Sequence, residues 1–150
     1  MPTKHQELGA FGETLVADLC RCPRCKPEKK TFKRLPPNFK CADLICDFCG
    51  FLAQVKASTA ADIDTMPKAI MGAAWEPQKA RMDAAIYFPL YVVLATTDKK
   101  QSSVWYLSAD LQPKSLFKQR EPLSPTAKRA GWQGFMYDID AVASCFVRLV

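Results

Sequence analysis

Four cysteines have the spacing of a structural zinc site. The pairs Cys22-Pro-Arg-Cys25 and Cys46-Asp-Phe-Cys49 are separated by twenty residues. Each pair can present two sulfurs to one tetrahedral ion from a tight turn, and four thiolates leave no position for water. The spacing therefore predicts a structural Zn²⁺ ion, with four unrelated buried cysteines as the alternative. For the remaining cysteines we expect the role of small buried hydrophobic residues; they are Cys20, Cys41 and Cys145.

A second set of residues could hydrolyse a phosphodiester bond. Asp43 precedes Gln54 by eleven positions, and Lys56 follows two positions later. If segments 41–46 and 51–58 form a hairpin, Gln54 and Lys56 share one side, because strand side chains alternate. Asp43 would reach the same place through the turn. Oxygen ligands suit Mg²⁺, and a lysine can activate water or neutralise developing charge.

Single residues of this set also have ordinary structural explanations. Asp43 could be a turn or zinc-knuckle residue, and Lys56 a solvated base on a strand. Glu13 could be a surface acid on a helix. Only their occurrence together, beside the two cysteine pairs, favours a catalytic site.

The Asp-x10-Gln-x-Lys arrangement resembles the PD-(D/E)XK nuclease superfamily, which often supplies a further metal-directed carboxylate where Glu13 stands. CPRC, ADLICDFCGFLAQVKAS and EPLSPTAKRAGWQG are similar to the catalytic domain of DpnI-type restriction endonucleases, from about Glu13 to Ala141. The resemblance implies Mg²⁺-dependent cleavage of double-stranded DNA carrying N6-methyladenine in GATC. It makes Asp43, Gln54 and Lys56 the metal and water residues, and the four paired cysteines the zinc ligands.

Two departures from that family pattern matter. Gln54 replaces the usual Glu, which removes one negative charge and should weaken Mg²⁺ binding. The second departure is length, from which we expect no C-terminal winged-helix reader of the usual kind. Reading of the DNA is then expected to depend on the catalytic domain, a separate DNA-reading partner or a homo-oligomer. A non-catalytic zinc-dependent DNA-binding module is the alternative function, and a zinc-ribbon protein-interaction domain is a third.

The segment 124–132 offers candidate DNA contacts. We expect a short helix with Ser124 as N-cap, Pro125 in its first turn and Gly131 at its end. Amides near the helix start could bind a phosphate, and an aromatic face could pack on an adenine methyl group. A core aromatic beside Phe135 is the alternative for the tryptophan. The candidate contacts are Ser124, Thr126, Lys128, Arg129 and Trp132.

Charge favours an anionic partner. The formal net charge is +6, which falls to about +4 if four thiolates hold one zinc ion. Eight Lys or Arg residues face one acid, Glu28, between positions 21 and 40. Clustered bases are typical of phosphate-binding surfaces, although a solvated face is the ordinary alternative. The absence of a membrane-length apolar run and of a signal-peptide core predicts a cytoplasmic protein.

The pattern of elements predicts one α/β domain spanning residues 1–150, with a four-cysteine zinc loop inserted at 20–50. The family resemblance implies a restriction-endonuclease-like mixed β-sheet flanked by helices. Apolar residues at helical spacing indicate a helix over 7–19. Four prolines indicate a loop over 21–40. A helical region that Pro77 should kink or break is expected at 66–84. Strands are expected at 41–46, 51–58, 90–96, 103–107 and 145–150.

Overall fold

The computed structural model of the chain describes residues 1–37, 39 and 42–150. These residues form two compact units. The first comprises Met1–Thr65, Phe88–Ala109 and Phe146–Val150, and the second comprises Met66–Tyr87 and Asp110–Cys145. The first unit carries both the cysteine pairs and the Asp-Gln-Lys set. Cys41, for which a buried position is expected, lies outside the described residues.

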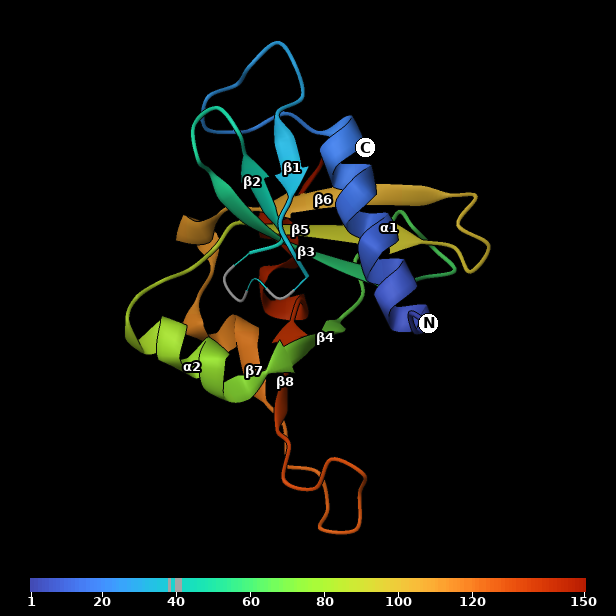
Figure 1. Cartoon of the computed structure of the whole chain (residues 1–150), viewed down its shortest axis with the longest axis vertical. Coiled ribbons are helices and arrows are strands. Elements are labelled where there is room, and N and C mark those ends of the chain that lie inside the picture. The colour runs from blue at the N-terminus through green and yellow to red at the C-terminus, as the bar shows by residue number, and fades with distance from the viewer. Residues whose placement is uncertain (38, 40–41) are drawn as a thin grey trace. The chain divides into compact units, whose positions relative to one another are not determined.

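The first unit is built on a mixed sheet (Figure 1). Its strands in the described residues have the spatial order β1-β2-β3-β5-β6-β9. Only β3 and β5 run parallel among these neighbours, and the other pairs are antiparallel. The strand bounds are β1 Phe32–Arg34, β2 Leu44–Cys46, β3 Leu52–Thr59, β5 Leu90–Ala95, β6 Ser102–Leu107 and β9 Val147–Arg148. This arrangement confirms the expected mixed α/β fold.

Helix α1 (Lys4–Leu19) packs on the sheet through a small residue. The helix begins at a capping box between Thr3 and Gln6, which satisfies amides of its first turn. A Cβ atom at Gly12 would lie 2.9 Å from the Ala57 Cβ on β3. A larger side chain at Gly12 would therefore push the helix off the strand. The close approach fixes the next residue, Glu13, beside the β1–β2 hairpin.

The second unit has a small antiparallel sheet of its own, in the order β4-β8-β7. Its strands are β4 (Ala69–Ala74), β7 (Phe117–Gln119) and β8 (Gly134–Asp138), and its helix α2 spans Trp75–Asp83. The short 3-10 turns lie at Ala109–Leu111, Lys114–Leu116 and Asp140–Cys145. Aromatic rings fill its interior, with Phe135 contacting Trp75, Phe117 and Tyr137 at centroid distances of 5.1–6.3 Å.

The expected helical region at 66–84 is only half right. Its first part is β4, which pairs with β8, and only Trp75–Asp83 is helical. The alanines of this region suit either structure, so the pairing with β8 decides. Gly72 on β4 lies against the Phe135 ring, where any Cβ would collide. Pro77 does not break α2, because it is the third helical residue and its missing N–H has no partner within the helix anyway.

The expected short helix over 124–131 is wrong. The segment forms successive turns within a loop instead. Leu123 and Trp132 close the loop, because the Leu123 N–H donates to the Trp132 carbonyl at 2.8 Å. Gly131 adopts a positive φ of 78° and donates its N–H to Leu123. These hydrogen bonds across the loop favour a turn over a helix. Ser124 and Pro125 therefore begin a turn and not a helix.

Two further boundaries differ from the sequence-based expectation. The loop over 21–40 contains β1, whose pairing with β2 brings Phe32 opposite Cys46. The last strand is limited to Val147–Arg148, and Cys145 ends a 3-10 turn. Pairing with β2 makes a strand of Phe32–Arg34, although prolines lie on both sides of it in the sequence. That strand connects the cysteine-bearing loop directly to the Asp43 region.

Candidate functional site

The four paired cysteines form a single cluster. Their Sγ atoms all lie within 4.8 Å of one another, and this is the group of potential metal ligands found in the described part of the chain. The distance from Cys22 to Cys49 is 3.5 Å and that from Cys25 to Cys46 is 3.7 Å between Sγ atoms. A tetrahedral zinc ion with bonds of about 2.3 Å separates its sulfurs by roughly 3.8 Å. The cluster therefore fits a metal ion, and its all-sulfur donor set suits zinc.

The cluster is attached to the sheet. Cys46 is the last residue of β2 and is buried, as is Cys22. The Thr31 hydroxyl lies 3.0 Å from the Cys46 Sγ. The Gly50 N–H donates to the Cys46 carbonyl at 2.9 Å and the residue has a φ of 79°, which closes the second knuckle. Any ion held here would fix the end of the hairpin that leads to Asp43.

The pKa values of two thiols of the cluster are shifted in opposite directions. Burial and the neighbouring thiols of Cys49, Cys22 and Cys46 raise the pKa of Cys25 to about 12. Burial opposes ionisation of Cys46, but hydrogen bonds from Thr31 and from knuckle amides lower its pKa to about 6. The cluster therefore carries protons near neutral pH, and a metal ion must displace them to bind four thiolates.

Asp43 is held against β3 by two hydrogen bonds. Its N–H donates to the Ala53 carbonyl at 2.9 Å. Its carboxylate Oδ2 accepts the Val55 N–H at 2.8 Å. The pairing of β2 with β3 stops at Leu44, which lies opposite Ala53. Beyond that point the Asp43 carboxylate accepts the hydrogen bond that a backbone carbonyl of a longer strand would accept. Asp43 therefore lies beside the two neighbours of Val55.

Those neighbours are Gln54 and Lys56. Both are partly buried and alternate along β3 with Ala53 and Val55, which are buried. Gln54 donates its backbone N–H to the Pro89 carbonyl at 2.9 Å on the β5 side. The alternation puts the Gln54 and Lys56 side chains on one face of the strand, as the sequence predicts.

Glu13 completes a charged group with Asp43. Burial, followed by repulsion from the Asp43 carboxylate, raises the pKa of Glu13 above its usual value of 4.5. Arg34 and Lys56 partly oppose that rise. The Arg34 Nε lies 3.4 Å from the Glu13 Oε1, and the Glu13 side chain is 20% exposed. Two carboxylates and a lysine therefore interact electrostatically here, which is the kind of site that binds a hard cation.

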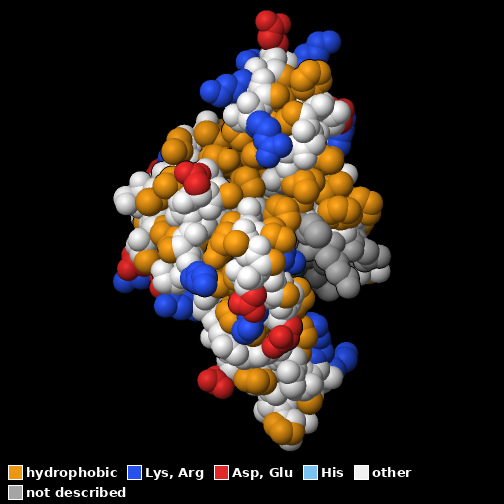
Figure 2. All heavy atoms as spheres, turned by 90° about the vertical axis from the view of Figure 1, so that its left-hand side faces the viewer, with side chains coloured by type: hydrophobic (Ala, Val, Ile, Leu, Met, Phe, Trp, Pro, Cys, Tyr) orange, Lys and Arg blue, Asp and Glu red, His pale blue; other side chains and the backbone are white. Residues whose placement is uncertain are grey.

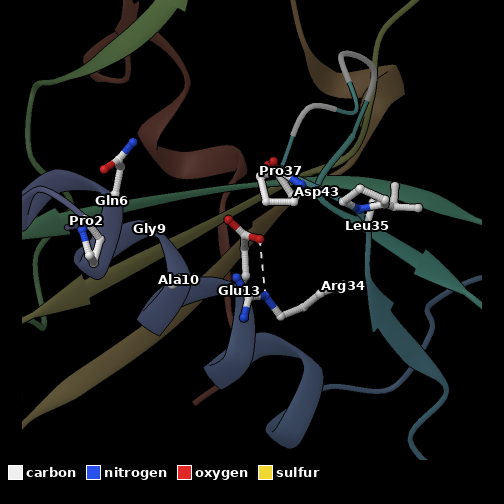
Figure 3. A pocket seen from close by; sticks show the side chains of 10 residues that line it. Pro2, Gln6, Gly9, Ala10, Glu13, Arg34, Leu35, Pro37 and Asp43 are labelled. Atoms are coloured by element: carbon white, nitrogen blue, oxygen red, sulfur yellow. Dashed lines mark hydrogen bonds and ion pairs between the residues drawn. The ribbon is translucent and has the colours of Figure 1, made fainter.

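An open hollow gives access to the two carboxylates, whereas Gln54 and Lys56 are not among its lining residues (Figure 3). The hollow has a volume of about 460 Å³. Glu13 reaches into it from α1, whereas Asp43 and the segment Arg34–Pro37 form the side facing the helix. Its lining residues are Pro2, Gln6, Gly9, Ala10, Glu13, Arg34, Leu35, Pro36, Pro37 and Asp43. A ligand approaching Asp43 through the hollow would meet both acids and Arg34.

Two residues of these sites escape the sequence-based prediction. Arg34 pairs with Glu13, and Thr31 contacts a cysteine sulfur. Both lie in the stretch interpreted as a loop without periodicity. The strand β1 brings them into place. A prediction that β1 pairs with β2 would therefore have located both residues.

The candidate DNA-contacting residues lie on the loop 123–132 of the second unit. Ser124, Thr126, Lys128 and Arg129 are exposed, and the Ser124 and Thr126 hydroxyls lie 3.0 Å apart. The Arg129 guanidinium stacks 4.6 Å from the Trp132 ring centroid. Trp132 is half-buried, and its ring covers Gly134, where a Cβ would come within 2.8 Å. The phosphate site expected from helix amides near Thr126 lacks its helix.

A family model named DpnI, described as the Dam-replacing family, matches residues 2–150. The chain belongs to this family. Membership of the DpnI family indicates a restriction-endonuclease-like function with DNA as the substrate and with dependence on methylation. No curated protein matches the chain. In the described part of the chain, no helix combines the length and apolar character needed to cross a membrane.

Proposed function

We propose that this protein is a Mg²⁺-dependent endonuclease that hydrolyses DNA at adenine-methylated sites of the GATC type. One observation carries the proposal. In a chain matched over 2–150 by the DpnI family, the Asp43 carboxylate is bonded to the backbone between Gln54 and Lys56 and repels Glu13 in an open hollow. The order of acid, amide and lysine along the hairpin is that of the PD-(D/E)XK nucleases.

The donor set fits a hard divalent cation. Asp43 would supply a carboxylate oxygen and Gln54 an amide oxygen, with Glu13 as a further carboxylate. When bound, Mg²⁺ would withdraw charge from the scissile phosphate and make water a stronger nucleophile. The raised pKa of Glu13 supports this assignment, because two acids that repel each other in the folded chain gain from a cation between them.

Lys56 is proposed to act on the phosphate. Its ammonium group can stabilise the negative charge that develops when water adds to phosphorus and a bridging P–O bond breaks. It can also orient the attacking water. The tetrathiolate cluster has a positioning role, since it fixes Cys46 at one end of β2 while Asp43 lies at the other.

Methyl recognition is proposed to lie on the loop 123–132. An adenine methyl group is read by an apolar surface, and Trp132 offers a half-exposed indole beside the Arg129 guanidinium. Lys128 and Arg129 would bind phosphates or base edges. A Trp132→Ala variant should lose the preference for methylated DNA, whereas Trp132→Phe should retain part of it. Equal preference in Trp132→Ala and wild type would remove the indole from this role.

A non-catalytic DNA-binding module is the second candidate, and Gln54 is the observation that favours it. An amide in place of a carboxylate lowers the charge that attracts the cation, so cleavage could be lost while DNA binding persists. The test is incubation of zinc-loaded protein with adenine-methylated and unmethylated plasmid in Mg²⁺ or Mn²⁺. The endonuclease proposal predicts cleavage of methylated plasmid only. Survival of both plasmids, with retained methyl-sensitive binding, would favour the second candidate.

A further inference from the structure

The tip of the cysteine cluster carries an exposed aromatic ring among exposed bases. Phe48 lies between Cys46 and Cys49 and is 79% exposed. Arg21, Arg24, Lys26, Lys29 and Lys30 are exposed around the first knuckle. We call Phe48 and these five bases the knuckle surface. Figure 2 shows Lys and Arg side chains gathered around the loop at the upper end of the view, with hydrophobic side chains among them.

The knuckle surface is held in place by the cluster beneath it. The Asp47 N–H donates to the Thr31 carbonyl at 3.0 Å, and Gly50 closes the turn onto Cys46, so that Phe48 stands on an anchored turn. The Arg24 guanidinium stacks 5.2 Å from the centroid of Phe51, a core residue. A single exposed apolar side chain is ordinary. Phe48 stands on an anchored turn beside one base, Arg24, that is held against the core, and this arrangement suits a binding surface.

Charge indicates what this surface binds. The exposed acids within it are Glu28 and Asp47, against five bases. A bound zinc ion with four thiolates would add two negative charges, but the sulfurs of Cys22 and Cys46 lie buried beneath the surface. The exposed Arg34 follows on β1, whereas its neighbour Lys33 points to the opposite face, because strand side chains alternate. Arg34 lines the hollow that contains Asp43 and pairs there with Glu13, so one base lies between the knuckle surface and the hollow.

The distance from the knuckle surface to Asp43 corresponds to a few base pairs of DNA. Cys46 ends β2, three positions after Asp43, which corresponds to about 10 Å at roughly 3.3 Å per residue. Successive base pairs of DNA are about 3.4 Å apart. A duplex with its scissile phosphate near Asp43 would therefore reach the knuckle surface about three to five base pairs away.

We propose that the knuckle surface is a second DNA-binding surface, which holds the duplex flanking the cleavage site. Its bases bind phosphates, and Phe48 packs against sugars or base edges in the adjoining groove. The proposal rests on the proposed function in taking DNA as the partner. It gives the zinc cluster a role beyond folding: the ion orders the turn that carries the flank contact.

The test measures binding of zinc-loaded protein to methylated GATC duplexes by fluorescence anisotropy at several salt concentrations, without added Mg²⁺. One duplex has about ten base pairs on each side of the site, and a second has about two, which is too short to reach the surface. Lys29→Gln/Lys30→Gln removes two knuckle bases. Lys4→Gln/Lys100→Gln removes two exposed bases elsewhere in the same unit and is the matched control. Zinc content of one ion per chain verifies the fold of each variant.

The proposal predicts that Lys29→Gln/Lys30→Gln lowers the salt slope of log K by about two on the long duplex, because each phosphate contact contributes about one. The control should leave that slope unchanged. Phe48→Ala should weaken long-duplex binding several-fold, and neither knuckle variant should affect the short duplex. If both knuckle variants bind the long duplex with the affinity and salt slope of wild type, the proposal is overturned. Phe48 would then be a contact for a protein partner. An equal loss in the control also overturns the proposal.

The outcome is separable from that of the proposed function. If the knuckle variants lose binding to the long duplex but the protein cuts no plasmid, the result supports this inference and contradicts the endonuclease proposal. If the protein cuts methylated plasmid and the salt slope of log K is the same in wild type and knuckle variants, the result supports the endonuclease proposal and contradicts this inference.

Discussion

The Val55 N–H donates a 2.8 Å hydrogen bond to the Asp43 carboxylate. An acid next to the cysteine-bearing hairpin is thereby fixed to the strand that carries Gln54 and Lys56. Strand β2 begins at Leu44, which pairs with Ala53, so the Val55 N–H lies beyond the paired residues and donates to the side chain of Asp43 instead. Structure and proposed chemistry thus depend on the same carboxylate, and the two roles can be separated by mutation.

Asp43→Asn and Asp43→Ala should separate these roles. Asparagine retains an oxygen that accepts the Val55 N–H, so its stability should stay close to that of wild type. Alanine leaves a buried N–H without its partner and should cost about 1–3 kcal/mol in the free energy of unfolding. Both variants lose the charge proposed to hold the cation and should lose cleavage. Thermal melts and plasmid digests measure the two effects. An active Asp43→Asn would contradict the metal-ligand role.

Gln54→Glu should strengthen binding of the divalent cation. The added negative charge would stand next to Val55, whose N–H binds Asp43, and it should increase the attraction for a hard cation held by Asp43. We expect half-maximal cleavage at a lower Mg²⁺ concentration than in wild type, by about tenfold or more if the charge is worth at least 1.4 kcal/mol of binding. Cleavage rates measured across a Mg²⁺ titration test this. An unchanged Mg²⁺ requirement would show that Gln54 is not a ligand.

Glu13→Gln should stabilise the protein in the absence of Mg²⁺ and weaken its activity. Burial and Asp43 raise the pKa of Glu13 above 4.5, so the ionised carboxylate disfavours the folded state. The stability contribution is fully present below the unfolded pKa, and it is lost as pH rises through the raised folded pKa. The variant should therefore melt slightly higher than wild type at neutral pH, with the difference disappearing below about pH 4.5. A lower melting temperature at neutral pH would show that the Arg34 contact outweighs the repulsion.

Removal of zinc should destabilise the hairpin that carries Asp43. Cys25→Ser removes one ligand of the cluster, and loss of a structural metal is among the changes that cost more than about 4 kcal/mol. In a chain of this length that corresponds to a fall of roughly 8–16 °C in melting temperature. Cys145→Ser, which alters a cysteine outside the cluster, is the matched control and should cost less than about 1 kcal/mol. Equal melting of the two variants would contradict a structural metal.

Local patterns in the sequence predicted much of the first unit. The cysteine spacing predicted the cluster, because each pair presents two sulfurs to one ion from a tight turn. Alternation on β3 predicted that Gln54 and Lys56 share a face, and apolar runs predicted β5 and β6. The role of Val55 in holding Asp43 could not be predicted, because it depends on where the pairing of β2 stops.

Long-range contacts explain the remaining differences. Alanines in 69–74 favour a helix locally, but pairing with β8 and the contact of Gly72 with Phe135 make that segment a strand. Ser124 and Pro125 have the form of a helix start, yet Leu123 bonds across the loop to Trp132. In both places a bond to a residue outside the local pattern, on β8 or across the loop, outweighs local preference.

Single-turnover cleavage by wild type and Lys56→Ala tests the proposed catalytic centre most directly. Zinc-loaded protein in excess is mixed with a fluorescent duplex containing one methylated GATC site, and Mg²⁺ or Mn²⁺ starts the reaction. Wild type should cut the duplex, and Lys56→Ala should cut at least about 100-fold more slowly while binding it with unchanged affinity and melting at the same temperature. Equal cleavage rates, or no cleavage by wild type with either ion, would contradict the account.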